Sequence, residues 1–402
     1  MTGVGFGPAN LALAIALTER DRRATFLETQ PRFGWHRDML LPGSRMQIPF
    51  LKDLVTLRNT KSEFTFVNYL SEHGRLIDFI GRHNVFPSRL EFHDYLDWAA
   101  GHFADDVHYD SRVVAVAAAD SGVGFVVHTA HGQRFSASTL VIGTGLHPVL
   151  PEAVRPSRRQ WHSHSLLPGL AGLPAPAASR FVVVGAGQSA AEVVAFLHRS
   201  YPRAQVHSVF TRYGYSVADD SAFANRIFDP STVDVFYGAD EQVRERLLGY
   251  HRSSNYSAVE PELIEDLYDR EYAEKVSGRH RLRMHKASAI TGVEEHAEAV
   301  RVTITGLADG STEKLDCDAV VYATGYAPMD VAAFLGDVAE HYEFDDRGRP
   351  VVGRDYRLAS TSGAPGDIFL NGATVEHTHG LGATLLSNVA VRAGEIAAAL
   401  YG

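Results

Sequence analysis

The chain has 402 residues, of which 45% are hydrophobic and 21% charged, the composition of an ordinary globular enzyme rather than of a disordered chain. Its formal net charge of -10 argues against binding to nucleic acid or to an anionic membrane, because both need clustered positive charge. No apolar run reaches the roughly 18 residues that span a bilayer, and no signal-like segment opens the chain. We therefore expect a cytoplasmic protein with small-molecule partners, no nucleic-acid partner and no membrane partner.

The first predicted element is a strand, a glycine turn and a helix, in the stretch GVGFGPANLALAIAL. Gly5 permits the tight turn, and Gly7 lets the backbone approach a pyrophosphate, which would lie on the N-terminal amides of the helix NLALAIALTE. Pro8, in the turn, is also expected to contact the cofactor. Asn10 stands where this cofactor-binding motif has its third glycine. Only residues 1–4 precede the turn, so the strand has to be central and buried.

The next predicted strand, RATFLE, ends in Glu28, about 20 residues after the turn, where an acid binds a ribose hydroxyl. The glycine turn alone is weak evidence, because such turns also occur by chance. Together, the turn and Glu28 predict an adenine dinucleotide site.

A second strand, turn and helix follow in RFVVVGAGQSAAEVVAFLHRS. Gly185 and Gly187 form this turn, and Gln188 and Ser189 begin the helix. The next strand runs into Arg212 instead of an acid, which suits the 2'-phosphate of NADPH. The alternative is that Arg212 is a solvated surface arginine.

Two further strand and Thr-Gly elements, TLVIGTGLHPVLP and DAVVYATGYAP, predict that one nucleotide-binding domain interrupts another. The predicted fold class is α/β, with two Rossmann-like dinucleotide-binding domains and a small mixed or helical substrate region. The predicted divisions are an FAD-binding domain at 1–165 and 315–402, an NADPH-binding domain at 166–314, a linker at 167–179, and helices and loops over a substrate cleft at about 213–272.

The first site offers an acid, Glu28, to the ribose of its dinucleotide, whereas the second offers an arginine, Arg212. This difference predicts two cofactors, FAD at the first site and NADPH at the second. The single cysteine, Cys317, excludes an intrachain disulfide, a cysteine-rich metal cluster and a CxxC redox pair, and we expect it to be a packing residue. His377 and His379 lack a nearby set of ligands, so no metal is expected. Molecular oxygen is then the leading electron acceptor.

The residues also resemble a known family, the class B flavin N-hydroxylating monooxygenases that act on the side-chain amines of L-ornithine and L-lysine. The resemblance covers nearly the whole chain and is specific, because its motifs occur in the family's order. These motifs are GFGPANLALA, FGWH, MLLPGSRMQIPFLKDLVTLRN, FTFVNYL, FPSRLEFHDYLDW, VVVGAGQSAAEV, DDSAFANRIFDP, NYSAV, ATGY and HTHGLGATLLS.

The resemblance implies that Trp35, His36, Met46 and Gln47 lie along the flavin. Gln47 would be near the reactive edge, where an amide can bond a ring nitrogen. The C-terminal motif implies that a helix begins near the flavin carbonyls, which favours negative charge on a reduced ring. The residues expected there are His379, Gly380 and Leu381.

The resemblance also implies a set of substrate contacts. Lys52 would pair with the substrate's α-carboxylate, although by itself it could be a buried charge with another partner or a surface lysine. Asn225 and Asn255 would contact substrate and NADP, whereas asparagine more often serves in turns and caps. Ser387 would face the substrate, or else bond a backbone carbonyl inside a helix.

The implied reaction is hydroxylation of a side-chain amine for siderophore or related biosynthesis. NADPH would reduce FAD, oxygen would form a flavin C4a-hydroperoxide, and the neutral amine would attack it. A desolvated pocket with neutral polar groups would help the amine lose its proton. The family also implies a homotetramer.

The substrate stays open among L-ornithine, which we rank first, L-lysine and another amino acid such as aspartate. Lys52 argues against diamines without a carboxylate. Arg226 and Pro49 depart from the glutamate and serine of the ornithine enzymes; Arg226 is either surface variation or a site for a second carboxylate. A Baeyer-Villiger oxygenase would need an FxGxxxHxxxWP motif, which is not found, and a non-catalytic binding protein is the remaining alternative.

Overall fold

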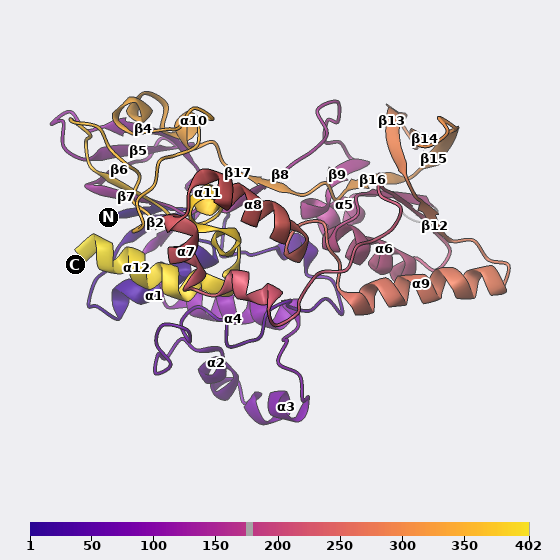
Figure 1. Cartoon of the computed structure of the whole chain (residues 1–402), viewed down its shortest axis with the longest axis horizontal. Coiled ribbons are helices and arrows are strands. Elements are labelled where there is room, and N and C mark those ends of the chain that lie inside the picture. Colours follow the sequence, from indigo (N-terminus) through magenta and orange to yellow (C-terminus); the bar gives the residue numbers. More distant parts are fainter. Residues whose placement is uncertain (174–179, 402) are drawn as a thin grey trace.

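The computed structural model describes residues 1–173 and 180–401. It confirms the α/β class and the two nucleotide-binding units, each built on a five-stranded parallel sheet. In Figure 1 both chain ends lie beside the first sheet, on the left, while α6, α9 and β12 of the second unit lie on the right. We call these units the first and second domains.

The sheet of the first domain has the order β18-β7-β1-β2-β3. Its strands are β1 (Thr2–Val4), β2 (Thr25–Leu27), β3 (Val107–His108), β7 (Thr139–Ile142) and β18 (Asp367–Leu370). The short strand β1 lies in the centre and all three of its residues are buried. This confirms that a three-residue strand is enough when it has a neighbour on either side.

The sheet of the second domain has the order β12-β11-β10-β16-β9 and corrects the predicted limits. Its strands are β9 (Gln160–His162), β10 (Arg180–Val184), β11 (Gln205–Val209), β12 (Leu282–His285) and β16 (Ala319–Tyr322). Two of these strands, β9 and β16, had been assigned to the first domain. Both strands are buried and pair in parallel within the second sheet. The second domain therefore extends from about 160 to about 322, beyond the predicted limits at 165 and 315.

Three smaller sheets complete the strands, and one of them explains the repeated Thr-Gly elements. The two-stranded sheet joins β8 (Leu146–Pro148) to β17 (Tyr326–Pro328), so that the two connections between the domains run antiparallel side by side. The other sheets are β4 (Val113–Ala118), β5 (Phe125–Thr129) and β6 (Arg134–Ala137), and β13 (Ser288–Glu295), β14 (Val300–Gly306) and β15 (Thr312–Cys317).

Helices cover both large sheets. They are α1 (Pro8–Thr18), α2 (Phe66–Glu72), α3 (Leu76–Gly81), α4 (Arg89–Gly101), α5 (Leu166–Ala171), α6 (Gln188–Ser200), α7 (Thr232–Gly238), α8 (Glu241–His251), α9 (Pro261–Val276), α10 (Val331–Leu335), α11 (Glu376–His379) and α12 (Val389–Tyr401). The apolar helix α1 is buried because it packs between its sheet, α4 and α12. None of the helices in the described ranges is both long and apolar enough to cross a membrane.

Two predictions about connecting segments have different outcomes. The expected linker at 167–179 is partly wrong, because α5 occupies its start; residues 174–179 lie outside the described residues. The expected helices and loops at 213–272 are confirmed by α7, α8, α9 and two short 3-10 turns, η3 (Ala224–Phe228) and η4 (Arg252–Ser254).

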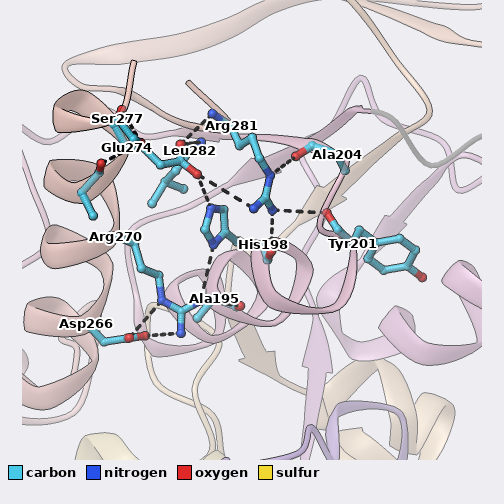
Figure 2. A network of polar contacts seen from close by, with 11 residues as sticks. Ala195, His198, Tyr201, Ala204, Asp266, Arg270, Glu274, Ser277, Arg281 and Leu282 are labelled. Atoms are coloured by element: carbon cyan, nitrogen blue, oxygen red, sulfur yellow. Dashed lines mark hydrogen bonds and ion pairs between the residues drawn. The ribbon is translucent and has the colours of Figure 1, made fainter. Parts of the chain in front are cut away.

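A polar network holds α9 to the second sheet (Figure 2). Glu274 on α9 accepts hydrogen bonds from the backbone amides of Arg281 (2.6 Å) and Leu282 (2.8 Å) and lies 2.7 Å from Nε2 of His198 on α6. Burial raises the pKa of Glu274, but the hydrogen bonds from Leu282, His198 and Arg281 outweigh it and hold the pKa below its usual range. The carboxylate therefore joins two helices and a strand.

Cys317 ends strand β15, and its thiol is buried. Its sulfur donates to the carbonyl of Val300 (3.3 Å), and burial raises the pKa of the thiol to about 12. The prediction of a packing role is confirmed.

Candidate active site between the two domains

A cleft of about 2460 Å³ runs between the domains and is lined by both glycine turns. Pockets for single ligands are usually about 300–1,000 Å³, so the cleft has room for more than one. Most of the predicted site residues line it: Gly5, Gly7, Pro8, Glu28, Trp35, His36, Met46, Gln47, Lys52, Gly185, Gly187, Gln188, Ser189, Arg212, Asn225, Asn255 and Ser387.

The first glycine turn has the geometry that a bound pyrophosphate needs. Gly5 has φ 84°, and a Cβ there would lie 2.6 Å from the carbonyl oxygen of Gly143. A Cβ on Gly7 would meet nothing within 4 Å, so the backbone is open to a ligand. Glu28 accepts hydrogen bonds from the amides of Phe6 (2.6 Å) and Gln30 (2.9 Å), which hold its carboxylate at the edge of the cleft.

Asn10 was predicted to bind cofactor, but its side chain does not line the cleft and is fully buried. Its amide nitrogen donates to the carbonyl of Gly5 (2.7 Å), and its amide oxygen accepts from Asn371 (3.0 Å). The prediction is corrected: Asn10 braces the turn from behind, where a glycine would leave the Gly5 carbonyl without this donor.

The second glycine turn has a similar backbone, but another segment of the chain lies over it. Gly185 has φ 135°, and a Cβ there would lie 2.4 Å from the carbonyl oxygen of Ala323. A Cβ on Gly187 would lie 3.5 Å from Cα of Ser257, so the segment that carries Asn255 passes beside the turn. The turn is therefore less open than the first one.

Arg212 lies at the mouth of the second turn. Its Nη1 donates to the carbonyl of Ser257 (2.8 Å), and the guanidinium forms no ion pair with any described residue, which leaves donors for a phosphate. The side chain of Gln188 is occupied: its Nε2 donates to Glu192 (3.0 Å) and its Oε1 accepts from the amide of Glu260 (2.9 Å). Gln188 therefore offers backbone rather than side-chain groups to a nucleotide.

Around the predicted flavin position, aromatic rings and the half-buried imidazole of His36 form one wall of the cleft. The ring of Trp35 meets that of His36 edge to face at 4.8 Å, and His36 meets Tyr326 in the same way at 6.3 Å. Burial, with smaller effects of Arg89 and His164, lowers the pKa of His36 to about 4, so the imidazole is neutral at physiological pH. Gln47 is exposed in the cleft, and Met46 beneath it is buried.

The predicted substrate contacts come from four segments of the chain, and all of them line the cleft. The ammonium of Lys52 forms no ion pair with any described residue. Asn225 donates to the carbonyl of Asp220 (2.5 Å), and Asn255 donates to the hydroxyl of Thr384 (3.4 Å). Ser387 is buried at the cleft wall in a 3-10 turn, not inside a helix. The set combines one cation with neutral polar groups.

Besides Asn10, three predicted cofactor-binding residues do not line the cleft. His379 is buried, with its ring stacked on Tyr356 at 4.2 Å, and burial lowers its pKa to about 4. Gly380 packs against a phenylalanine ring, and Leu381 is buried in the core. The motif forms α11 and short turns, and the long helix α12 starts only at residue 389, so the expected flavin contacts are corrected. The exposed Arg226 guanidinium lies over the ring of Phe223 and outside the cleft, which favours surface variation over a site for a second carboxylate.

Sequence reasoning missed two groups that line the cleft. Arg89 of α4 forms a bidentate ion pair with Glu192 of α6, with both distances 2.8 Å, which joins the two domains. Arg392 is a buried cation on α12. For Arg392, the sequence signal was an arginine within the apolar stretch VAVRAGEIAAAL. The spacing of residues along the chain does not show which residues Arg89 and Arg392 contact. Within residues 1–173 and 180–401, no cluster of three metal-ligating side chains was found.

Two nucleotide turns on two parallel sheets, with a cleft between them, define a dinucleotide-dependent oxidoreductase. The family model for L-lysine 6-monooxygenase/L-ornithine 5-monooxygenase matches residues 1–328, and the chain belongs to that family. It is 40% identical over 398 residues to an L-ornithine N(5)-monooxygenase of Burkholderia cepacia, covering 94% of this chain and 89% of the relative. The resemblance found in the sequence is confirmed.

Solved structures agree over the whole chain. The ornithine N-hydroxylase of Kutzneria sp. 744, solved with reduced FAD, NADP+ and L-ornithine, has a TM-score of 0.95 and 43% identity and covers 99% of this chain and 98% of its own. The ornithine hydroxylase of Pseudomonas aeruginosa has a TM-score of 0.92 and 36% identity and covers 100% and 98%.

Proposed function

We propose that the chain is an FAD- and NADPH-dependent monooxygenase that hydroxylates the side-chain amine of L-ornithine. One observation carries the substrate class: Lys52 places an ammonium without an ionic partner among the described residues in the cleft that both nucleotide turns line. Such a cation suits an α-carboxylate. The relatives named above act on ornithine, which puts this amino acid first and L-lysine, longer by one methylene, second.

The first domain has the residues to hold FAD. Gly7 leaves open space at the turn, the amides at the start of α1 suit phosphate, and Glu28 suits a ribose hydroxyl. When bound, FAD reduced by NADPH supplies the chemistry that activates oxygen for transfer to the amine. Arg212 beside the second turn suits the 2'-phosphate of NADPH.

The protein's own contribution is to position a neutral amine and to keep water out. Lys52 would bind the carboxylate, which leaves the other end of the amino acid beside Asn225 and Asn255. Since both asparagines are uncharged, their amide oxygens can accept a hydrogen bond from the neutral amine without stabilising its ammonium form as a carboxylate would. The buried Ser387 closes the wall of the cleft there.

A substrate panel tests the proposal. Ornithine, lysine, putrescine and aspartate are each supplied with FAD, NADPH and air, and the oxygenated product is identified by mass. We expect N5-hydroxyornithine as the main product and no hydroxylated aspartate, because Arg226 lies outside the cleft. Hydroxyputrescine as the main product would contradict the role of Lys52, and NADPH oxidation without any hydroxylamine would contradict the activity.

Lys52→Met sharpens the test. Loss of a hydrogen bond to a charged group costs about 1.5–3 kcal/mol, so the KM for ornithine should rise roughly 10- to 100-fold. Slow turnover of putrescine, which has no carboxylate, should not change. Lys61→Met is the matched control, because Lys61 is exposed in the same domain and does not line the cleft. The cytoplasmic location and the homotetramer stay predictions.

A further inference from the structure

A chain of buried side chains connects the first glycine turn to the substrate end of the cleft. Asn10, Asn371 and Arg392 are 0%, 2% and 4% exposed. Asn371 donates to Asn10 (3.0 Å), and Nε of Arg392 donates to the amide oxygen of Asn371 (2.9 Å). Asn10 in turn donates to the carbonyl of Gly5 (2.7 Å). Three hydrogen bonds in series therefore lead from the turn to Arg392.

The other end of Arg392 holds backbone of the substrate-side segment, residues 382–387. Its Nη1 donates to the carbonyl of Ala383 (3.1 Å) and, more weakly, to that of Gly382 (3.5 Å). This segment carries Thr384, which accepts from Asn255, and ends at Ser387. The guanidinium thus fixes the carbonyls directly before the residues that face the cleft.

The chemistry of this network is unusual for a buried cation. Its acceptors are an amide oxygen and two carbonyls, and no carboxylate of the described residues forms an ion pair with it. Burial lowers the pKa of Arg392, against opposing charge effects of Tyr356 and Glu395, which lie too far away to form an ion pair with it. A charge that is costly to bury and that lines the cleft is better explained by a role in the site than by stability alone.

We propose that Arg392 is a positioning residue for the hydroxylation, which holds the substrate-side segment in fixed register with the cofactor turn. This inference rests on the proposed function. The planar guanidinium is required because Nε and Nη1 point to two different partners, which a lysine ammonium cannot reproduce. A displaced segment would move the amine away from the reacting position, where small shifts are costly.

The test uses the FAD-loaded full chain and compares Arg392→Met, Arg392→Lys and the control Arg357→Met. Arg357 is a cation of the same domain that pairs with Asp367 and does not line the cleft. We expect Arg392→Met to raise the KM for ornithine about tenfold and to divert NADPH oxidation from hydroxylated product to hydrogen peroxide. The KM for NADPH should stay unchanged, because the second turn lies in the other domain.

Arg392→Lys separates charge from geometry and is the safer variant if Arg392→Met fails to fold. It keeps the positive charge but lacks the planar guanidinium, whose Nε and Nη1 reach two different acceptors. It should therefore also raise the KM for ornithine and the yield of peroxide, whereas Arg357→Met should not. The inference is overturned if the FAD-loaded lysine variant keeps the wild-type KM and product yield. It is also overturned if all kinetic parameters fall in parallel with thermal stability. Absence of hydroxyornithine with the wild-type protein would instead contradict the proposed function.

Discussion

The two glycine turns have related backbones but differ in what braces and covers them. The first turn is open at Gly7 and is held from behind by the side chain of Asn10. The second is overlaid at Gly187 by the segment around Ser257, and its third motif position is Ala190, which packs without a polar group. The same sequence motif thus forms an open site with a rigid polar support and a partly covered site supported by packing.

The difference also reaches the wider surroundings of each turn. The polar support of the first domain contains two asparagines and Arg392, and no ion pair within it. The second domain instead places a carboxylate, Glu274, at the centre of its network, away from the cleft (Figure 2). The buried polar network of the first domain thus ends at a cation that lines the cleft, whereas the network around Glu274 lies away from the cleft.

The largest effect is expected from placing a Cβ on the tightest turn. Gly5→Ala forces a residue with a side chain to φ 84° and brings its Cβ to 2.6 Å from the carbonyl oxygen of Gly143. Such strain should lower the free energy of unfolding of the FAD-free protein by about 3 kcal/mol. Gly187→Ala has φ -98° and an ordinary contact of 3.5 Å, so it should unfold like the wild type. Equal losses in the two variants, measured by denaturant unfolding, would contradict this comparison.

The next-largest effect concerns Arg212, which is expected to bind the 2'-phosphate on the ribose of NADPH at the second site. Arg212→Ala should raise the KM for NADPH and leave that for NADH unchanged, because only NADPH has the 2'-phosphate. The loss of a hydrogen bond to a charged group corresponds to roughly 1.5–3 kcal/mol. Arg203→Ala, an exposed arginine of the same domain, is the control. Steady-state rates with the two coenzymes check the prediction, and an equal rise for both would show that Arg212 does not distinguish them.

The sequence predicted what depends on local pattern. Both turns, the α/β class and the central position of β1 follow from glycine spacing and buried-type strands. Lys52, Asn225 and Asn255 came from the family motifs, and the structure brings them to the same cleft. Local pattern and family motif were therefore enough to select residues that the fold brings to one cleft, and their roles stay predictions.

What the sequence could not supply depends on long-range pairing. The assignment of β9 and β16 to the second sheet depends on the pairing of strands 160 residues apart, such as Gln160 with Val320, which no local pattern encodes. The hydrogen bond between Asn10 and Asn371 spans 361 residues. His379 was misplaced for a related reason, because the family motif does not say which of its residues turn away from the cleft.

The smallest effect tests the remote carboxylate. Glu274→Gln keeps the shape of the side chain but weakens its bonds from Arg281 and Leu282, so the free energy of unfolding at neutral pH should fall by about 1.5 kcal/mol. Because the pKa of Glu274 is lowered in the folded state, this stabilisation is present above the usual pKa of 4.5 and is lost as the pH falls through the lower, folded-state value. The gap between wild type and variant should therefore close in acid. Glu265→Gln, an exposed site on the same helix, should show no gap at any pH, and a gap that persists in acid would mean that Glu274 stabilises the domain through packing rather than through its charge.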